Sequence, residues 1–317
     1  MSARMTMALG TLLSLTACSY DFERSSEITD RRILAVQVDP PELAAGTPVP
    51  DFIQARALVV DPTDPLAVVE VSWSSCLRPA RAAAEVGRAE NTRCPEDEGT
   101  VLLASGSTPI ESVSQSIPIS EDMAGVLAAE TGLPAPQIHV QLEVDSEKGP
   151  LAAVKQVTVK TRLPEGQEPN RNPAIQGLKL DGTDWLPDEV RVIKYGDCPD
   201  ERKREVVGED DSLVVVCEHD LEPFFDEAEL QFYEERGFSG QLELQRERLQ
   251  FAWFATAGSF RQDMTRSFDP RDPSPDNVGP QNKWREPSTQ MERATLWVVV
   301  RDGRGGITWA RREVIFE

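Results

Sequence analysis

Cysteine is the residue type in this chain with the most definite chemistry. Four cysteines lie in the body of the 317-residue sequence, at Cys76, Cys94, Cys198 and Cys217. In an oxidising compartment an even number of cysteines indicates disulfides, and four of them allow three pairings. Proximity favours Cys76 with Cys94, 18 positions apart, and Cys198 with Cys217, 19 positions apart. A zinc site built from all four thiolates is the alternative, but no C-x-x-C pair supports it.

Histidine offers little acid-base chemistry, because the chain has two, His139 and His219. His139 lies on a predicted strand whose neighbours Gln137 and Gln141 share its face, so we expect a solvated position. His219 follows Cys217 beside a predicted disulfide, and no further pattern marks it as catalytic or metal-binding. The sequence also lacks a nucleophile elbow, a zinc-protease helix and a phosphate-binding glycine loop. We therefore expect neither an enzyme nor a cofactor.

The 54 acidic residues leave two alternatives open. A glycoside hydrolase needs only a pair of carboxylates, and turns rich in aspartate offer the oxygen ligands that calcium prefers. The calcium candidates are Asp61 with Asp64, Asp197 with Asp200, Glu209 with Asp210 and Asp211, and Asp269 with Asp272 and Asp276. None has the twelve-residue calcium loop, so we expect ordinary turn aspartates. Asp145 and Asp302 are expected to cap their own hairpin turns.

Charge and composition exclude one class of protein and limit the fold. The 33 basic and 54 acidic residues give a net charge of −21, which excludes a nucleic-acid binder because phosphate recognition needs a basic surface. Hydrophobic residues make up 39% of the chain, enough for a globular core. The length indicates two domains, and 24 prolines against 20 glycines favour strands joined by rigid turns over long helices.

The N-terminus has the pattern of a processing signal. Arg4 precedes an apolar stretch that ends in small residues before Cys18, and this stretch is too short for a stable membrane span. The residues 15–18, Leu-Thr-Ala-Cys, resemble the lipobox of bacterial lipoproteins, which implies removal of residues 1–17 and acylation of Cys18. Ser19 stands where an inner-membrane retention signal has Asp, so the same resemblance implies the outer membrane. The mature surface is strongly acidic and is repelled by anionic lipid, so we expect the acyl chains to provide the anchor.

Short alternating stretches predict strands at 33–38, 52–60, 67–73, 138–144 and 154–160, with one short helix near 121–130. The second half then repeats the first. Residues 33–39 resemble 175–181, and the loop 145–149 resembles 302–306. Trp73 and Trp253 each lie in an apolar strand between these landmarks. The second copy is longer, and we place an insertion at about 195–240. The insertion contains an apolar strip at 221–232, and we expect this strip to pack the insertion onto its own domain.

Strands of this length, with a central tryptophan strand and a closing hairpin, predict antiparallel β-sandwiches. The stretches 251–260 and 296–306 resemble bacterial immunoglobulin-like and polycystic-kidney-type domains, which are binding and spacer modules of envelope proteins. The fold we expect is all-β, with two tandem immunoglobulin-like sandwiches and a disulfide-closed insertion in the second. The predicted segments are a signal at 1–17, an acidic tether at 18–30, domains at 31–162 and 174–317, and a proline-rich linker at 163–173.

Lipobox, tether and sandwich domains together are similar to uncharacterised lipoproteins of predatory or social bacteria. They predict a lipid-anchored outer-membrane protein with a structural or binding role, facing the periplasm or the cell surface. The membrane is then one partner, held through the lipid on Cys18, and an envelope protein or glycan is a second. Hydrolysis of an envelope glycan and calcium-stabilised adhesion are the alternatives.

Overall fold

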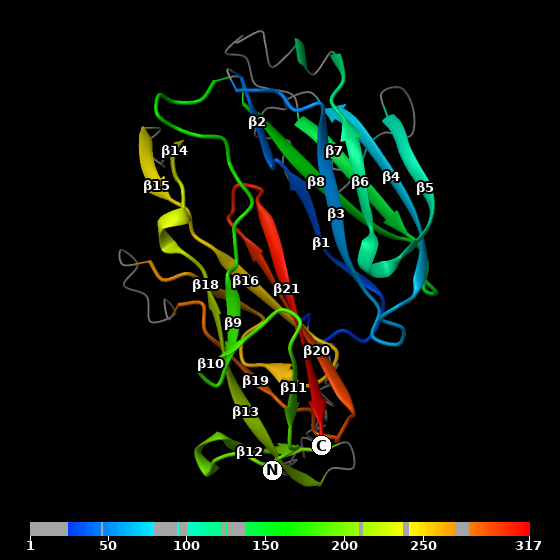
Figure 1. Cartoon of the computed structure of the whole chain (residues 1–317), viewed down its shortest axis with the longest axis vertical. Helices are drawn as coiled ribbons and strands as arrows, with labels where there is room; N and C mark the ends of the chain where they lie inside the picture. Colours follow the sequence, from blue (N-terminus) through cyan, green and yellow to red (C-terminus); the bar gives the residue numbers. More distant parts are fainter. Residues whose placement is uncertain are drawn as a thin grey trace, which may run out of the picture.

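The computed structural model describes residues 25–45, 47–78, 94, 100–121, 124–125, 137–160, 162–208, 212–236, 241–269 and 279–317. Two groups of strands lie one above the other in Figure 1, the first half of the chain above and the second below. The predicted signal and Cys18 lie outside the described residues, and so does most of the predicted helix, of which Glu121, Ala124 and Gly125 are described as helical. No helix in the described ranges is long and apolar enough to cross a membrane.

The first half forms a β-sandwich. One sheet has the order β1-β3-β6, from β1 (Arg32–Asp39), β3 (Phe52–Val60) and β6 (Ser114–Pro118). The other has the order β2-β8-β7-β4-β5, from β2 (Glu42–Ala44), β8 (Leu151–Lys160), β7 (Gln137–Val144), β4 (Val68–Arg78) and β5 (Thr100–Pro109). Inward side chains alternate along β3, and Ile53, Trp73 and Leu142 lie in the core between the sheets.

The second half forms another sandwich. Its first sheet has the order β10-β9-β13-β19-β17, from β10 (Thr183–Trp185), β9 (Gly177–Leu180), β13 (Leu213–Phe224), β19 (Asn282–Arg285) and β17 (Ser259–Phe260), with β12 (Lys203–Val207) paired to β13. Its second has the order β11-β21-β20-β16-β18, from β11 (Val190–Ile193), β21 (Ile307–Phe316), β20 (Arg293–Arg301), β16 (Gln250–Ala255) and β18 (Met264–Arg266). A separate hairpin pairs β14 (Phe232–Arg236) with β15 (Leu242–Arg246).

The sheets of the two halves correspond strand by strand. The order β2-β8-β7-β4-β5 has its counterpart in β11-β21-β20-β16-β18, and β1-β3-β6 in β9-β13-β19. Trp73 on β4 and Trp253 on β16 occupy equivalent strands, and the final hairpins β7–β8 and β20–β21 are equivalent too. Among the named strands, whose other pairs are antiparallel, parallel pairs occur at the same place in both halves, β2 with β8 and β11 with β21. The chain is therefore all-β, with two immunoglobulin-like sandwiches.

The predicted insertion at 195–240 differs from the structure, because it contains β13. This strand lies between β9 and β19 in the middle of its sheet, the place that β3 takes in the first half. The extra residues of the second half therefore lie on either side of β13. One part is the disulfide-closed loop with β12, and the other is the hairpin β14–β15. β13 was not recognisable as a core strand because His219 and Glu218, charged and polar residues, occupy buried positions on it.

A shared interface joins the halves. Leu34, Ala35 and Val60 of the first half pack with Trp297 and Val299 of the second in one buried cluster. At its edge, the Arg56 guanidinium lies 4.7 Å from the ring centroid of Trp309. The burial of this apolar surface holds the two sandwiches together.

Ile28 belongs to the same cluster, which corrects the predicted tether at 18–30. Its exposed fraction is 1%, its N–H donates to the Ala255 carbonyl at 2.9 Å, and the Ala255 N–H donates to the carbonyl of Ser26 at 2.9 Å. The segment from Ser25 adds to β16 beyond the end of β18, because an apolar side chain at Ile28 gains more from the interface than from water. Any tether therefore ends before Ser25.

The predicted linker at 163–173 is also fixed in place. Asn170 is buried, and its amide Nδ2 donates to Oδ2 of Asp302 at 2.8 Å. Asn172 donates from Nδ2 to the Val38 carbonyl at 2.8 Å and accepts from the Ile307 N–H at 3.0 Å. These asparagines bind backbone and side-chain groups of both halves, which composition alone did not indicate.

Candidate functional site

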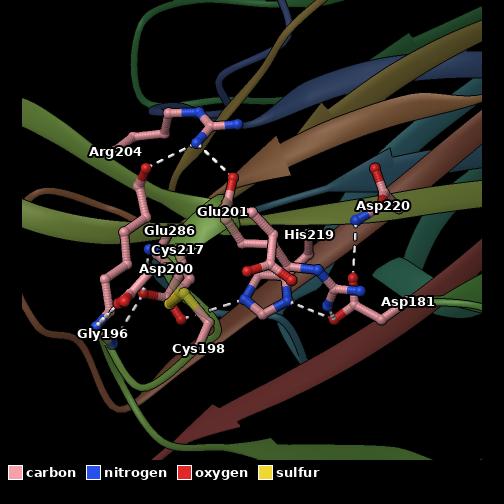
Figure 2. Close-up of a disulfide and its surroundings, with 12 residues drawn as sticks. Asp181, Gly196, Cys198, Asp200, Glu201, Arg204, Cys217, His219, Asp220 and Glu286 are labelled. Carbon is pink, nitrogen blue, oxygen red and sulfur yellow. Dashed lines mark hydrogen bonds and ion pairs between the residues drawn. A yellow bond between two sulfur atoms is a disulfide. The ribbon is translucent and has the colours of Figure 1, made fainter.

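His219 lies between two carboxylates on the second sandwich (Figure 2). Its Nδ1 is 2.9 Å from Oδ2 of Asp181, and its Nε2 is 3.2 Å from Oε1 of Glu286. The side chain is 7% exposed. A neutral imidazole has one N–H, whereas two carboxylate partners require two, so this arrangement holds the imidazolium form.

Charge in this cluster follows from its geometry. Burial by itself lowers the pKa of His219, but the hydrogen bonds to Asp181 and Glu286 and their charges outweigh burial and raise the pKa to about 9. Burial raises the pKa of Asp181, and hydrogen bonds from His219 and Asp220 with the charge of Arg202 outweigh it, so the net shift is downward. The imidazole centroid lies 5.7 Å from the Trp284 indole, which covers the ring.

A tight turn positions Asp181. Asp181 and Gly182 connect β9 to β10 with φ values of 54° and 78°, the left-handed pair typical of an Asp-Gly hairpin turn. Oδ1 of Asp181 accepts from the Asp220 N–H at 2.9 Å, and Oδ2 lies 2.7 Å from the Arg202 guanidinium. The turn, β13 and the 3-10 turn Asp200–Arg202 therefore fix this carboxylate from three sides.

Glu286 connects the histidine to the disulfide. Its side chain is fully buried, and Oε2 accepts from the N–H groups of Cys217 and Gly196, each at 3.0 Å. Cys198 is bonded to Cys217 with their Cα atoms 6.0 Å apart, which ties the loop after β11 to β13. The predicted Cys198–Cys217 pair is confirmed. Cys217, His219 and Glu286 are residues of types that bind metals and lie close together, but the sulfur of Cys217 is bonded to Cys198 in the disulfide.

The first half has a simpler disulfide. Cys76 and Cys94 are bonded with Cα atoms 5.7 Å apart, as predicted. The Cys94 N–H donates to Oε1 of Gln141 at 3.1 Å, so Cys94 lies over one face of β7. His139 lies on this strand and is 6% exposed. The prediction of a solvated His139 is therefore wrong, because the disulfide brings Cys94 over the face that strand alternation would leave to water.

Four of the calcium candidates that the structure describes, Asp61, Asp64, Asp200 and Asp269, are engaged within their own turns or by basic residues, and Asp197 is exposed. Asp61 accepts from the N–H groups of Thr63 and Asp64 through Oδ1 and pairs with Arg31 through Oδ2 at 3.0 Å. Asp200 lies 2.8 Å from Lys203. Asp269 pairs with Arg248 at 3.4 Å. Glu209, Asp210, Asp211, Asp272 and Asp276 lie outside the described residues.

A second polar cluster lies at the junction of the two halves and was not predicted from the sequence. Oδ1 of Asp302 accepts from the N–H groups of Arg304 and Gly306 at 2.7 and 2.9 Å, so the predicted turn cap at Asp302 is confirmed. Glu247 receives the Arg304 guanidinium at 2.8 Å, and burial raises its pKa with help from the charge of Asp302. Burial also lowers the pKa of Lys155 to about 8, the charge of Asp302 acting in the opposite direction. Only tertiary contacts identify this cluster.

Asp145 contributes its backbone instead of a capping side chain, since its N–H donates to the Glu70 carbonyl and its own carbonyl accepts from Arg31. Within the predicted apolar strip, Phe225 and Leu230 pack against the core of the second sandwich. The strip therefore holds this segment onto its own domain, as expected.

A hollow of about 620 Å³ lies between the 166–174 segment and the loop after β13. Four carboxylates line it, those of Glu168, Asp226, Glu229 and Glu247. Glu247 is hydrogen-bonded to Arg304, Glu168 pairs with Arg171, and Asp226 accepts from the Ala228 N–H at 2.8 Å. Three of the four are therefore engaged by neighbouring groups of the chain, and this hollow adds no specific support for glycan hydrolysis.

No protein-family model matches the chain, and a search of curated proteins finds no match. Solved structures with some likeness include red sea bream transglutaminase, at 9% identity and a TM-score of 0.24, over 92% of this chain and 32% of that one. The fibronectin(III)-like modules of Clostridium thermocellum CbhA match at 11% identity with a TM-score of 0.21, over 89% of this chain and 94% of that one. A complex of Dpr2 Ig1-Ig2 with DIP-Theta Ig1-Ig3 matches at 10% identity with a TM-score of 0.20, over 91% of this chain and 100% of that one. The chain spans about a third of the transglutaminase. These scores are too low to assign a relationship, and the order of the strands is what defines the fold.

Proposed function

We propose that this protein is a lipid-anchored protein of the bacterial outer membrane whose paired sandwiches have a structural or binding role. The lipobox-like residues 15–18 support the anchor, and two disulfides suit an oxidising compartment. The single observation that carries the structural role is the shared interface. A buried cluster, a bound linker and the segment around Ile28 make the two sandwiches one unit.

We further propose that the second half lies nearest the membrane. The support is that Ser25 donates from Oγ to Oδ2 of Asp263 at 3.1 Å, just before β18 in the second half. Only seven positions separate Ser25 from Cys18, and an extended chain spans at most about 3.5 Å per residue, or about 25 Å here. A lipid on Cys18 would therefore keep this edge of the second sandwich within about 25 Å of the bilayer, although the second sandwich is the C-terminal half of the chain.

The proposed recognition surface is the hairpin of β12 with the first half of β13. Val207, Leu213 and Val215 are 62%, 70% and 45% exposed, and their pairing in register places them on one face. Exposed apolar side chains grouped on a disulfide-closed hairpin support contact with an envelope protein. Since β13 continues into the core, the hairpin is held rigidly.

The anchor is tested by Cys18→Ala, which should move the protein from the membrane fraction to the soluble fraction. Ser19→Asp keeps the cysteine and serves as its matched control, because it should stay in membranes but move from outer to inner membrane. Persistence of the Cys18→Ala protein in membranes would contradict lipidation.

The recognition surface is tested by replacing Val207, Leu213 and Val215 with Ser and comparing crosslinked partners from whole cells. The control replaces Leu242 and Leu244, 59% and 62% exposed on the other hairpin, with Ser. We expect the first variant to lose partners that the second retains. Identical partner sets in both variants and the wild type would remove the recognition role from this hairpin.

A further inference from the structure

Two side chains of types that bind zinc, those of His219 and Glu286, lie beside the Cys198–Cys217 disulfide. Within the described part of the chain, Sγ of Cys217, a ring nitrogen of His219 and a carboxylate oxygen of Glu286 lie within 4.8 Å of one another, and all three residues are buried. Cys198 adds a fourth ligand type, since its Sγ is bonded to that of Cys217. Two thiolates, an imidazole and a carboxylate are donors that zinc accepts in tetrahedral sites. Donors around such an ion lie about 3.3 to 3.8 Å apart, so small movements would suffice.

The groups that would orient these ligands are already in place. Asp181 holds Nδ1 of His219, which leaves Nε2 directed at Glu286 and the disulfide (Figure 2). A carboxylate on the second nitrogen of a metal-binding histidine fixes the ring and makes it a better ligand. Glu286 is held likewise, because its Oε2 is occupied by two backbone N–H groups and its Oε1 faces the histidine.

The two sulfur atoms are placed differently. Cys217 is fully buried on β13, whereas Cys198 lies on the loop after β11 between exposed residues Asp197 and Pro199. Only the loop sulfur has to move away from its partner for both to reach one ion. Cys198 is half-buried and Cys217 fully buried, so a reductant would approach from the Cys198 side.

We propose that Cys198, Cys217, His219 and Glu286 bind one zinc ion when the disulfide between the two cysteines is reduced. A dithiol reductant supplies two electrons and two protons, the S–S bond breaks, two thiols form, and the reductant becomes a disulfide. Zinc then displaces the two thiol protons and the proton on Nε2 of His219. The disulfide and the zinc ion are thus alternative states of one site, and oxidation of the thiolates releases the metal. This goes beyond the proposed envelope role and does not depend on it.

The other disulfide provides an internal comparison. Neither Cys76 nor Cys94 belongs to a metal-ligand cluster among the described residues. His139 is paired with Cys76 across β4 and β7, and it presents its carbonyl to Cys94, with O and Sγ 3.8 Å apart. The same reduction at this site therefore yields two thiols beside one histidine, but these residues do not form a group of three ligand atoms within 4.8 Å of one another, as the second site does.

The test uses the full chain with Cys18→Ala, reduced with a phosphine that is then removed, and titrated with Zn²⁺ alone. Co²⁺ is the spectroscopic probe, because tetrahedral thiolate coordination gives visible d–d and thiolate charge-transfer absorption. We expect one zinc ion per reduced chain and none in the oxidised chain. Replacing both Cys76 and Cys94 with Ser should leave binding intact, and replacing both Cys198 and Cys217 with Ser should abolish it.

Asp181→Asn tests the positioning role of that carboxylate. It should weaken zinc binding about 10- to 100-fold while the Co²⁺ spectrum stays that of two thiolates, and its fold is checked in the oxidised state by near-UV circular dichroism. If reduction unfolds the protein, zinc should restore the near-UV signal. Equal binding after loss of Cys198 and Cys217, no binding after loss of Cys76 and Cys94, or no recovery of an unfolded reduced chain by zinc would each overturn the proposal.

Discussion

Replacing His219 with Gln in the oxidised protein should cost stability in a way that depends on pH. The pKa of His219 rises from 6.5 to about 9 in the folded protein, with burial opposing and the carboxylates of Asp181 and Glu286 favouring the charged ring. A difference of about 2.5 pKa units corresponds to about 3 kcal/mol of the free energy of unfolding. The variant leaves the fully buried carboxylate of Glu286 without its cation, whereas the half-buried Asp181 keeps Arg202 at 2.7 Å, and the first of these is a loss of the same order.

The direction in which the stabilisation by His219 changes with pH follows from proton binding. Because the folded state holds the proton more tightly than the unfolded state, the stabilisation is complete below pH 6.5 and is lost as pH rises through 9. The difference in unfolding free energy between wild type and His219→Gln should therefore shrink by about 3 kcal/mol between pH 6 and pH 10. Urea unfolding of both proteins at several pH values measures it, and NMR titration of the ring gives the pKa directly. A difference that is constant with pH, or a measured pKa of 6.5 or below, would refute the reasoning.

Three other changes test the fold. Gly258→Ala should lower Tm by several degrees more than Gly303→Ala: both glycines have φ near +79°, but a Cβ at Gly258 collides with the Arg285 carbonyl and the Trp284 indole, whereas Gly303 has open space. Equal Tm values in differential scanning calorimetry would contradict this. Replacing Cys76 and Cys94 with Ser should reduce the free energy of unfolding by about 3 kcal/mol, and a loss below 1 kcal/mol in urea would show that this loop is constrained by other contacts. Ile28→Ala should cost about 2 to 4 kcal/mol because Ile28 is 1% exposed in the interface, and an unchanged urea midpoint would mean that the segment is not packed in solution.

Much of the architecture could be predicted from local pattern. Alternation in 52–60 and 138–144 gave strands that the structure confirms as β3 and β7, and the repeat of 145–149 at 302–306 marked two equivalent final hairpins. Proximity paired the cysteines correctly. These features depend on residues that are close together in the sequence, so they can be predicted from the sequence alone.

The candidate site depends on residues that are far apart in sequence. Asp181 is 38 positions from His219 and Glu286 is 67, and neither carboxylate differs in local pattern from the other acidic residues. β13 was misassigned for the same reason. Its buried His219 and Glu218 are acceptable only because partners from β9, β19 and nearby loops satisfy them. A strand that carries a charged residue can be assigned to the core only when the partner of that residue is known.

The position of Ile28 has a consequence for the order in which the chain folds. Its backbone partner Ala255 is 227 positions later, and a contact of such sequence separation is slow to close. The first sandwich has its own core and can form without this contact. We therefore expect the segment to dock late in folding, once the sheet that contains β16 has formed. Until then Ile28 is exposed to any chaperone that binds apolar segments.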